Sequence, residues 1–310
     1  MEHHDVLIAG GGIAGLTAAA RLAADGRTVA LADPAPAPNA CPPDLRTTAL
    51  LQPALETLRT AGIWPGLERI GAPLRVMRLV DAGGREQKPR ETADFTGAPA
   101  GADLFGWNLP NQPLKDALWS HLQAQPSVTL LPGTKVTDYT ARMDRAFARL
   151  SDGSQRTADL IVAADGRDST LRDAAGIAKR RWGYGQKALV FAVTHPNPHD
   201  GVSTEIHRTG GPLTLVPLPD HEGRPASSIV WMMRGAEADA MAALDDSALA
   251  LELTARTMGL YGPLEIASKR ALWPIISQAA LQLTARRLVL VAEAAHVMPP
   301  IGAQGLNTSL

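Results

Sequence analysis

Two segments, one near each end of the chain, carry glycines at a spacing that binds a phosphate-bearing cofactor. Near the start, Gly10, Gly12 and Gly15 form the pattern G-x-G-x-x-G. The first glycine permits a tight turn, the second lets backbone N–H groups approach a pyrophosphate, and the third lets a helix pack closely on a strand. Because the helix N-terminus then faces the phosphates, this segment predicts dinucleotide binding.

The residues around these glycines supply the strand and the helix that the pattern needs. An apolar run at 5–9 precedes them, and an Ala- and Leu-rich stretch at 13–24 follows them. A second apolar run at 28–32 completes a βαβ unit and ends in Asp33. An acid at this place accepts hydrogen bonds from ribose hydroxyls. The alternative for Asp33 is a surface acid at the end of a strand.

The segment 293–307 reads Glu-Ala-Ala-His-Val-Met-Pro-Pro-Ile-Gly-Ala-Gln-Gly-Leu-Asn, and we call it the closing segment. Its carboxylate directly follows an apolar strand at 288–292, and two glycines lie in a short loop after the prolines. Glycine lacks a Cβ, so such a loop lets the backbone come close to a flat cofactor. The cofactor contacts expected here are Glu293, Pro300, Gly302, Gly305, Leu306 and Asn307.

A third segment, from Asp165-Gly166 to Arg172, follows a predicted strand at 158–165. Taken alone, it is equally typical of a β-turn with a charged rim. In order with the other two segments, it resembles the three fingerprints of the class A flavoprotein aromatic hydroxylases, the group that includes para-hydroxybenzoate hydroxylase. The resemblance covers the chain from end to end.

The resemblance implies that FAD is the cofactor. The opening glycines and Asp33 would bind its ADP half, Asp165 and Gly166 would contact FAD and the route of NAD(P)H, and Glu293 would bind the ribityl chain. The family motif usually reads Gly-Asp-Ala-Ala-His, whereas this chain has Ala-Glu-Ala-Ala-His at 292–296. The acid is retained but is one methylene longer, so we expect a changed binding geometry.

Further contacts are implied between the first two motifs. Arg46 resembles the arginine that pairs with the pyrophosphate or shields the flavin, and a planar guanidinium suits phosphate; the alternative is a surface residue. Asn111 and Gln112 occupy the place of a family residue that often touches the cofactor. His296 titrates near neutral pH when unperturbed, but the resemblance favours a packing role. We assign no covalent or acid–base catalyst.

Outside the motifs, the order of helix-like and strand-like segments, together with the family resemblance, predicts an α/β fold with a Rossmann-like FAD-binding domain and an interleaved α+β substrate domain. Helical spacing occurs at 114–122 and at 236–258, with a break near Asp245-Asp246. The other predicted features are β-like pieces at 74–90 around a Gly83-Gly84 turn, strands at 128–136, a hairpin turn at 151–154, and antiparallel strands at 189–194, 212–216 and 228–233. We expect an FAD-binding domain at 1–73, 98–178 and 279–310, and a substrate domain at 74–97 and 179–278.

Composition excludes several classes of protein. With 310 residues, 45% hydrophobic, 20% charged and a net charge of −1, the chain is neither disordered nor suited to nucleic acid. The single cysteine, Cys41 in a proline-rich loop, excludes the cysteine pair of a flavin disulfide reductase. An NAD-dependent dehydrogenase stays an alternative, although it has no use for the closing segment.

The start of the chain lacks the pattern of a signal peptide, and no apolar run approaches the roughly 20 residues of a membrane span. We therefore expect a cytoplasmic protein whose contact with the inner face of the membrane, if it makes one, is peripheral.

Segments 184–195, 207–219 and 228–231 resemble substrate-domain strands of the ubiquinone-biosynthesis hydroxylases within the group. This implies a polyprenylated phenol and O₂ as substrates. NAD(P)H would reduce FAD, O₂ would form a C4a-hydroperoxide, and the phenolic ring would attack it. The ring position, the tail length, the electron donor and the oligomeric state stay open, including a homodimer or a contact with a ubiquinone-biosynthesis complex.

One alternative concerns the end of the sequence. Relatives continue past Asn307 with a helix whose N-terminal N–H groups face the flavin, whereas only Thr308-Ser-Leu310 follows here. Because so short a helical fragment does not support itself, the alternative expectation is a truncated product that holds FAD weakly or lacks activity.

Overall fold

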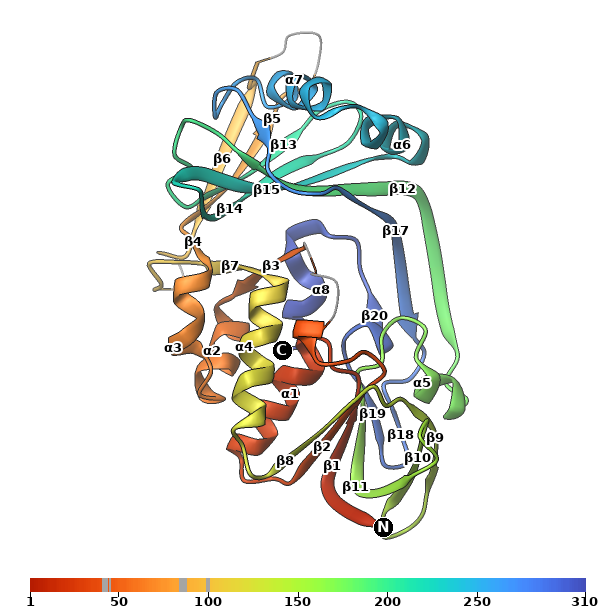
Figure 1. Ribbon diagram of the computed structural model, residues 1–310. Helices are drawn as coiled ribbons and strands as arrows, with labels where there is room; N and C mark the ends of the chain where they lie inside the picture. Colours follow the sequence, from red (N-terminus) through yellow and green to blue (C-terminus); the bar gives the residue numbers. More distant parts are fainter. Residues whose placement is uncertain (41–43, 45, 84–87, 99–100) are drawn as a thin grey trace.

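The computed structural model describes residues 1–40, 44, 46–83, 88–98 and 101–310, in three sheets with helices packed around them (Figure 1). Cys41 and Gly84 of the predicted turn lie outside these residues. The helices are α1 (Ile13–Ala24), α2 (Gln52–Thr60), α3 (Trp64–Leu67), α4 (Asn111–Gln123), α5 (Thr170–Ala174), α6 (Gly235–Ala243), α7 (Asp246–Arg256) and α8 (Gln304–Asn307). In the described residues, no helix has the length and apolar character needed to cross a membrane.

An eight-stranded sheet follows the order β18-β19-β11-β1-β2-β8, and β10 and β9 extend it from β11. β1, β2, β8, β11 and β19 run parallel, so their carboxyl ends lie at one edge of the sheet. The strands are β1 (Glu2–Ala9), β2 (Val29–Asp33), β8 (Val128–Pro132), β9 (Val136–Ala141), β10 (Ala146–Leu150), β11 (Gln155–Ala163), β18 (Thr284–Ala285) and β19 (Leu288–Leu290).

This sheet is buried on both faces, which explains the nearly continuous apolar runs of its central strands. Helices α1, α2 and α4 pack on one face around Ile8, Leu31 and Leu55, each fully buried. The other face packs around Leu7 and Ile161, with contributions from β9 and β10. The predicted helix at 13–24, the βαβ unit and the 151–154 hairpin are confirmed.

A nine-stranded sheet lies above the first one in the view of Figure 1, and α6 and α7 cover its outer face. Its order is β20-β17-β12-β15-β14-β13-β5-β6, with β16 beside β12. The strands are β5 (Val76–Asp81), β6 (Glu91–Thr96), β12 (Lys179–Thr194), β13 (Val202–His207), β14 (Leu213–His221), β15 (Arg224–Arg234), β16 (Glu265–Ile266), β17 (Ala271–Ala280) and β20 (His296–Val297).

The predicted antiparallel arrangement of β12, β14 and β15 is confirmed. The pattern did not reveal β13 and β17, and β13 pairs in parallel with β5, so the sheet is mixed. The predicted break in the helix at 236–258 is also confirmed, because the Asp245 carboxylate caps α7 by accepting a hydrogen bond from Ala248 N at 2.8 Å. The predicted domain boundaries stay predictions.

A small third sheet joins the two large ones. It consists of β3 (Thr47–Leu51), β7 (Gly106–Pro110) and β4 (Ala72–Leu74), in that order. Asn108 of β7 is buried and donates a hydrogen bond to the carbonyl of Pro217 in β14 at 2.8 Å. The two large sheets are also linked by the long strands β12 and β17 (Figure 1).

The long strand pair is interrupted near its middle. The pairing of β12 with β17 shifts between Gly183 and Lys187, opposite Ile276 and Pro274. Gly185 has a φ of +65°, a left-handed conformation that glycine adopts without steric cost. The two strands therefore change register at one place within the nine-stranded sheet.

A buried arginine holds together the loops that follow β11 and β19. Arg172 has an exposed fraction of 0%, and its Nη1 donates hydrogen bonds to the carbonyls of Arg167 at 3.1 Å and Ala294 at 3.2 Å. Its charge is balanced by Asp173, whose carboxylate lies 3.2 Å from Nη2. The side chain thus fixes the spacing of two loops far apart in sequence.

We expect Arg172→Met to destabilise the protein by about 1–3 kcal/mol, because the buried Ala294 carbonyl loses its donor while the volume is nearly kept. The Arg167 carbonyl retains a hydrogen bond from Gln278 Nε2 at 2.8 Å. Urea unfolding followed by circular dichroism measures the change. Arg180→Met, on an exposed side chain, is the control and should shift the free energy of unfolding by less than about 0.5 kcal/mol. Equal stability of the two variants would contradict the assigned role of Arg172.

Candidate functional site

In the glycine loop between β1 and α1, Gly10 and Gly15 are tightly packed, whereas Gly12 borders open space. A Cβ on Gly10 would lie 2.2 Å from the Ala164 carbonyl oxygen, and one on Gly15 would lie 1.9 Å from the Gly10 oxygen. Gly12 differs, because nothing lies within 4 Å of the place its Cβ would take. No side chain caps α1 here, so its first N–H groups are available to an anion.

Asp33 lies at the end of β2, beside this loop. One carboxylate oxygen accepts a hydrogen bond from Gly11 N–H, and the other accepts from Ala35 N at 2.7 Å. The acid therefore braces the glycine loop from the neighbouring strand. Its contact with a ribose stays a prediction.

The Asp165-Gly166 pair follows β11, directly beside β1. Asp165 Oδ2 accepts a hydrogen bond from Leu171 N at 3.2 Å, whereas Oδ1 is buried and has no partner among the described residues. Gly166 turns the chain with a φ of +84°. A buried acceptor without a donor is costly, so the Oδ1 position is suited to a donor supplied by a ligand.

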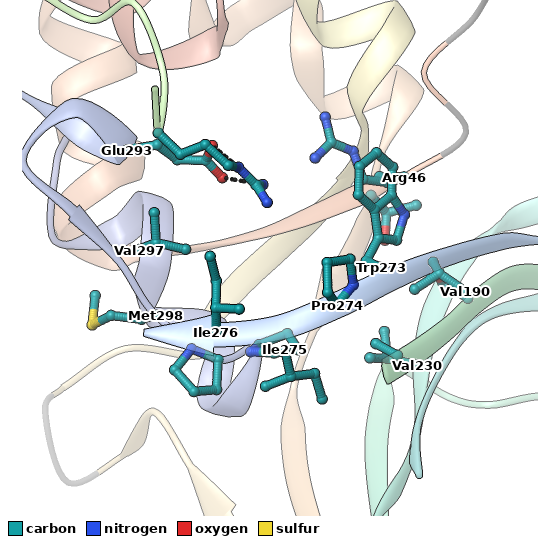
Figure 2. Close-up of a pocket in the computed structure, with 16 residues that line it drawn as sticks. Arg46, Val190, Val230, Trp273, Pro274, Ile275, Ile276, Glu293, Val297 and Met298 are labelled. Carbon is teal, nitrogen blue, oxygen red and sulfur yellow. Dashed lines mark hydrogen bonds and ion pairs between the residues drawn. The ribbon is translucent and has the colours of Figure 1, made fainter. Parts of the chain in front are cut away.

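Arg167 and Glu293 connect the second motif to the closing segment. The guanidinium of Arg167 donates two hydrogen bonds to the Glu293 carboxylate, at 3.2 and 3.1 Å (Figure 2). Both side chains are partly exposed, so the pair contributes at most about 1 kcal/mol to stability. Its importance is geometric, because it orients the acid. The motif pattern did not assign Arg167, although its position directly after Asp-Gly was a usable signal.

Arg46 lies across the cavity from this pair (Figure 2). Its Nε and Nη2 each donate to the Asp44 carboxylate at 2.8 Å, and its guanidinium carbon lies 4.8 Å from the ring centroid of Trp273. Burial of Asp44 disfavours its charge, but hydrogen bonds from Arg46 and Asn111 outweigh burial and hold the pKa of Asp44 well below its ordinary value. The hydrogen bonds that Arg46 donates to Asp44 in turn raise the pKa of Arg46.

Asn111 and Gln112, at the start of α4, hold Asp44 in place. Asn111 Nδ2 donates to Asp44 Oδ2 at 3.2 Å, and Gln112 Oε1 accepts from Asp44 N at 3.2 Å. Asn111 Oδ1 also accepts from the Thr48 hydroxyl at 2.6 Å. The structure thus gives both amides protein partners, and their contact with a cofactor stays a prediction.

The closing segment folds back onto β3. Asn307 Oδ1 accepts a hydrogen bond from Leu51 N at 2.8 Å, and its Nδ2 donates to the Ala49 carbonyl at 2.7 Å. This amide therefore continues the backbone pairing of β3. Pro300, Gly302, Gly305 and Leu306 line a cavity instead.

His296 lies at the base of the closing segment. Its Nε2 is 3.3 Å from the Ser309 hydroxyl oxygen and 3.4 Å from that of Thr308. Burial lowers the pKa of His296, which favours the neutral ring. These contacts agree with the predicted packing role.

Two cavities meet between the carboxyl edge of the first sheet and the inner face of the nine-stranded sheet. The smaller one, about 200 Å³, is lined by Arg167, Glu293 and Trp273 among others (Figure 2). The larger one measures about 780 Å³. Because they share wall residues, the two cavities adjoin, and we call them together the cleft. The shared residues are Arg46, Thr47, Val230, Met298, Pro299 and Pro300.

The wall of the larger cavity is mostly apolar, with contributions from Leu74, Met77, Phe95 and Phe105. Among its described lining residues, Glu205 is the only acid. This side chain lies on β13, a strand that the sequence pattern did not reveal. No motif pointed to it, so sequence reasoning missed it.

Comparison with known proteins places this geometry in a family. The model of a family described as an FAD binding domain matches residues 3–310. Ubiquinone hydroxylase UbiL of Rhodospirillum rubrum is 34% identical over 308 residues, which cover 99% of this chain and 70% of the relative. The 3-demethoxyubiquinol 3-hydroxylase of Escherichia coli is 29% identical, with coverage of 98% of this chain and 76% of the relative.

A crystal structure of PqsL from Pseudomonas aeruginosa, in complex with 2-aminobenzoylacetate, superposes with a TM-score of 0.82. It covers 99% of this chain and 83% of that chain, at 20% identity, and so shows a shared fold. The fold, the match over residues 3–310 and the relatives agree with the resemblance drawn from the three motifs. The chain belongs to the FAD-binding domain family, among its aromatic monooxygenases.

Proposed function

We propose that this protein uses FAD, NAD(P)H and O₂ to hydroxylate the phenolic ring of a polyprenylated phenol in ubiquinone biosynthesis. The cleft carries the proposal, because its larger, mostly apolar cavity is lined by the closing segment, and its smaller cavity is lined by Arg167 and Glu293. The names of the two relatives supply the substrate class. Peripheral contact with the inner face of the membrane is part of the proposal, since a polyprenyl tail partitions into lipid.

The residues at the edge of the first sheet fit FAD. The open space before Gly12 and the uncapped start of α1 suit a pyrophosphate. The buried, unpaired Oδ1 of Asp165 suits a hydroxyl or N–H donor of the cofactor. The Glu293 carboxylate, held by Arg167, is positioned for the hydroxyls of the ribityl chain.

When bound, FAD would supply the redox chemistry that transfers one oxygen atom from O₂ to the ring. The protein's own residues bind and orient the cofactor and the substrate, and they exclude water from the site. Arg46 and Trp273 form one wall where the two cavities meet, and Pro299 and Pro300 form another. This junction is the place where a flavin in the smaller cavity would face a ring in the larger one.

The larger cavity has the size and lining for the proposed ring. Small-molecule sites typically measure about 300–1,000 Å³ and are mostly apolar, and this cavity of about 780 Å³ falls within that range. Phe95, Phe105 and Leu104 provide apolar surface for a ring and the first part of a prenyl tail.

We expect Gly12→Ala to weaken FAD binding at least about tenfold, because a methyl group would occupy the space where backbone N–H groups approach the pyrophosphate. Folding should be unaffected, since the added Cβ meets no atom within 4 Å. Quenching of flavin fluorescence on titration with protein gives the dissociation constant.

Gly66→Ala is the matched control, because this glycine is exposed, lies in α3 and also has open space around its Cβ position. It should bind FAD as the wild type does. If Gly12→Ala binds FAD as tightly as Gly66→Ala, the pyrophosphate is not held at this loop. If the wild type neither quenches flavin fluorescence nor shifts the flavin spectrum at micromolar FAD, the prediction that this chain binds the cofactor is wrong.

The reaction itself is tested with FAD-loaded protein, NADH or NADPH, and a phenol with a short prenyl tail. We expect the phenol to accelerate NAD(P)H oxidation several-fold, because substrate binding positions the ring beside the flavin. Mass spectrometry should detect a product heavier by one oxygen that derives from isotopically labelled O₂. Oxidation that is indifferent to every phenol, without labelled product, would refute the proposed function.

A further inference from the structure

Glu205 is a buried acid in the wall of the larger, mostly apolar cavity. Its exposed fraction is 7%, and it lies on β13, where side chains alternate between the two faces of the sheet. Ile206 and Thr204 point to the opposite face, where Ile206 joins the core and the Thr204 hydroxyl lies 2.8 Å from that of Tyr261. Ser203 and Glu205 therefore face the cavity, and both line it.

One protein partner holds this carboxylate. His207, two residues along the same strand face, places Nε2 at 2.8 Å from Glu205 Oε1. The imidazole is about half exposed, with 52% of its side chain accessible, so it approaches the acid from the solvent side. Asp81, opposite His207 in the register of β5, is already paired with Arg90. The Glu205–His207 contact is thus the acid's only polar contact among the described residues.

Among the described residues, none donates a hydrogen bond to the acid from the cavity side, although the hydroxyls of Ser203 and Thr214 belong to the same wall. Opposite Glu205, the register of β5 places Leu79 and that of β14 places Thr214. The one cation of the described cavity wall, Arg46, already donates two hydrogen bonds to Asp44. A buried carboxylate with remaining acceptor capacity is costly unless a donor reaches it, and the cavity itself is the space from which a donor can come.

We propose that Glu205 receives the hydroxyl group of the phenolic ring and thereby selects neutral phenols over rings that carry a carboxylate. The inference rests on the proposed function, since it names the part of the substrate that this cavity recognises. A phenolic O–H donates a charge-assisted hydrogen bond to the carboxylate. His207 is a positioning residue, because it touches the acid and not the ring.

The Glu205 carboxylate also disfavours rings that carry a carboxylate or lack a free hydroxyl. A ring carboxylate in this cavity would lie near Glu205 without a free cation to balance it, and like charges at close range in a dry site repel strongly. A methyl ether of the phenol would fill the same space but leave the acid without its donor. A site that hydrogen-bonds a hydroxyl rejects analogues that lack it.

Three ligands separate these effects: a short-chain prenylphenol, its O-methyl ether, and the same phenol with a carboxylate on the ring. Calorimetric titration into FAD-loaded protein gives each dissociation constant without requiring turnover. For the wild type, we expect the phenol to bind at least about tenfold more tightly than the ether, since a hydrogen bond to a charged group contributes about 1.5–3 kcal/mol. The carboxylated ring should bind more weakly still.

Two substitutions distinguish hydrogen bonding from charge. Glu205→Leu should remove the preference for the phenol over the ether. Glu205→Gln has nearly the same shape and should keep part of that preference, because the amide oxygen still accepts a hydrogen bond. It should also improve binding of the carboxylated ring at least about tenfold, because the repulsion between like charges is gone. Glu252→Gln, on the exposed face of α7, is the control and should change none of the three constants.

Flavin content and circular dichroism show which variants fold. If Glu205→Leu does not fold, the affinity of Glu205→Gln for the carboxylated ring still tests the inference. If Glu205→Gln binds the carboxylated ring as weakly as the wild type does, the inference is refuted and the proposed function stays intact. If the wild type binds none of the ligands and no phenol accelerates NAD(P)H oxidation, the proposed function itself fails and the inference fails with it.

Discussion

The parallel pairing of β1, β11 and β19 is the constraint on which the site depends. Three segments that are far apart in the chain follow these three strands, and the pairing brings their carboxyl ends to one edge of a sheet. Arg172 then fixes the distance between two of the loops, at 3.1 Å from one carbonyl and 3.2 Å from the other. α/β folds bind ligands at the carboxyl ends of their parallel strands. The position of the cofactor site therefore follows from the topology.

Much of this arrangement could be predicted from the sequence because it is local. The glycine spacing, the apolar runs and the Asp245 cap each depend on neighbouring residues, and the structure places α1 and the break before α7 where the pattern did. The family resemblance supplied the relation among distant motifs. By contrast, β13 carries a charged and a polar side chain on its cavity face, so its pattern does not read as a half-buried strand.

The roles of individual side chains were harder to predict for a related reason. Asparagine and arginine serve equally well as ligand contacts or as supports for backbone, and residue type does not distinguish the two uses. Asn307 continues the hydrogen bonding of β3, and Asn111 holds Asp44, which in turn holds Arg46. The contacts of Asn307 and Asn111 join segments separated by tens to hundreds of residues. Only the folded chain shows which groups they leave for a ligand.

The interruption in the β12–β17 pair has a mechanical consequence. A ladder of regular hydrogen bonds resists bending, whereas a register shift removes that resistance over a few residues. The break at Gly183–Lys187 lies within the nine-stranded sheet, part of which lines the larger cavity. The irregular backbone also borders the smaller cavity, because Pro274, Ile275 and Ile276 lie opposite the shift and line that cavity.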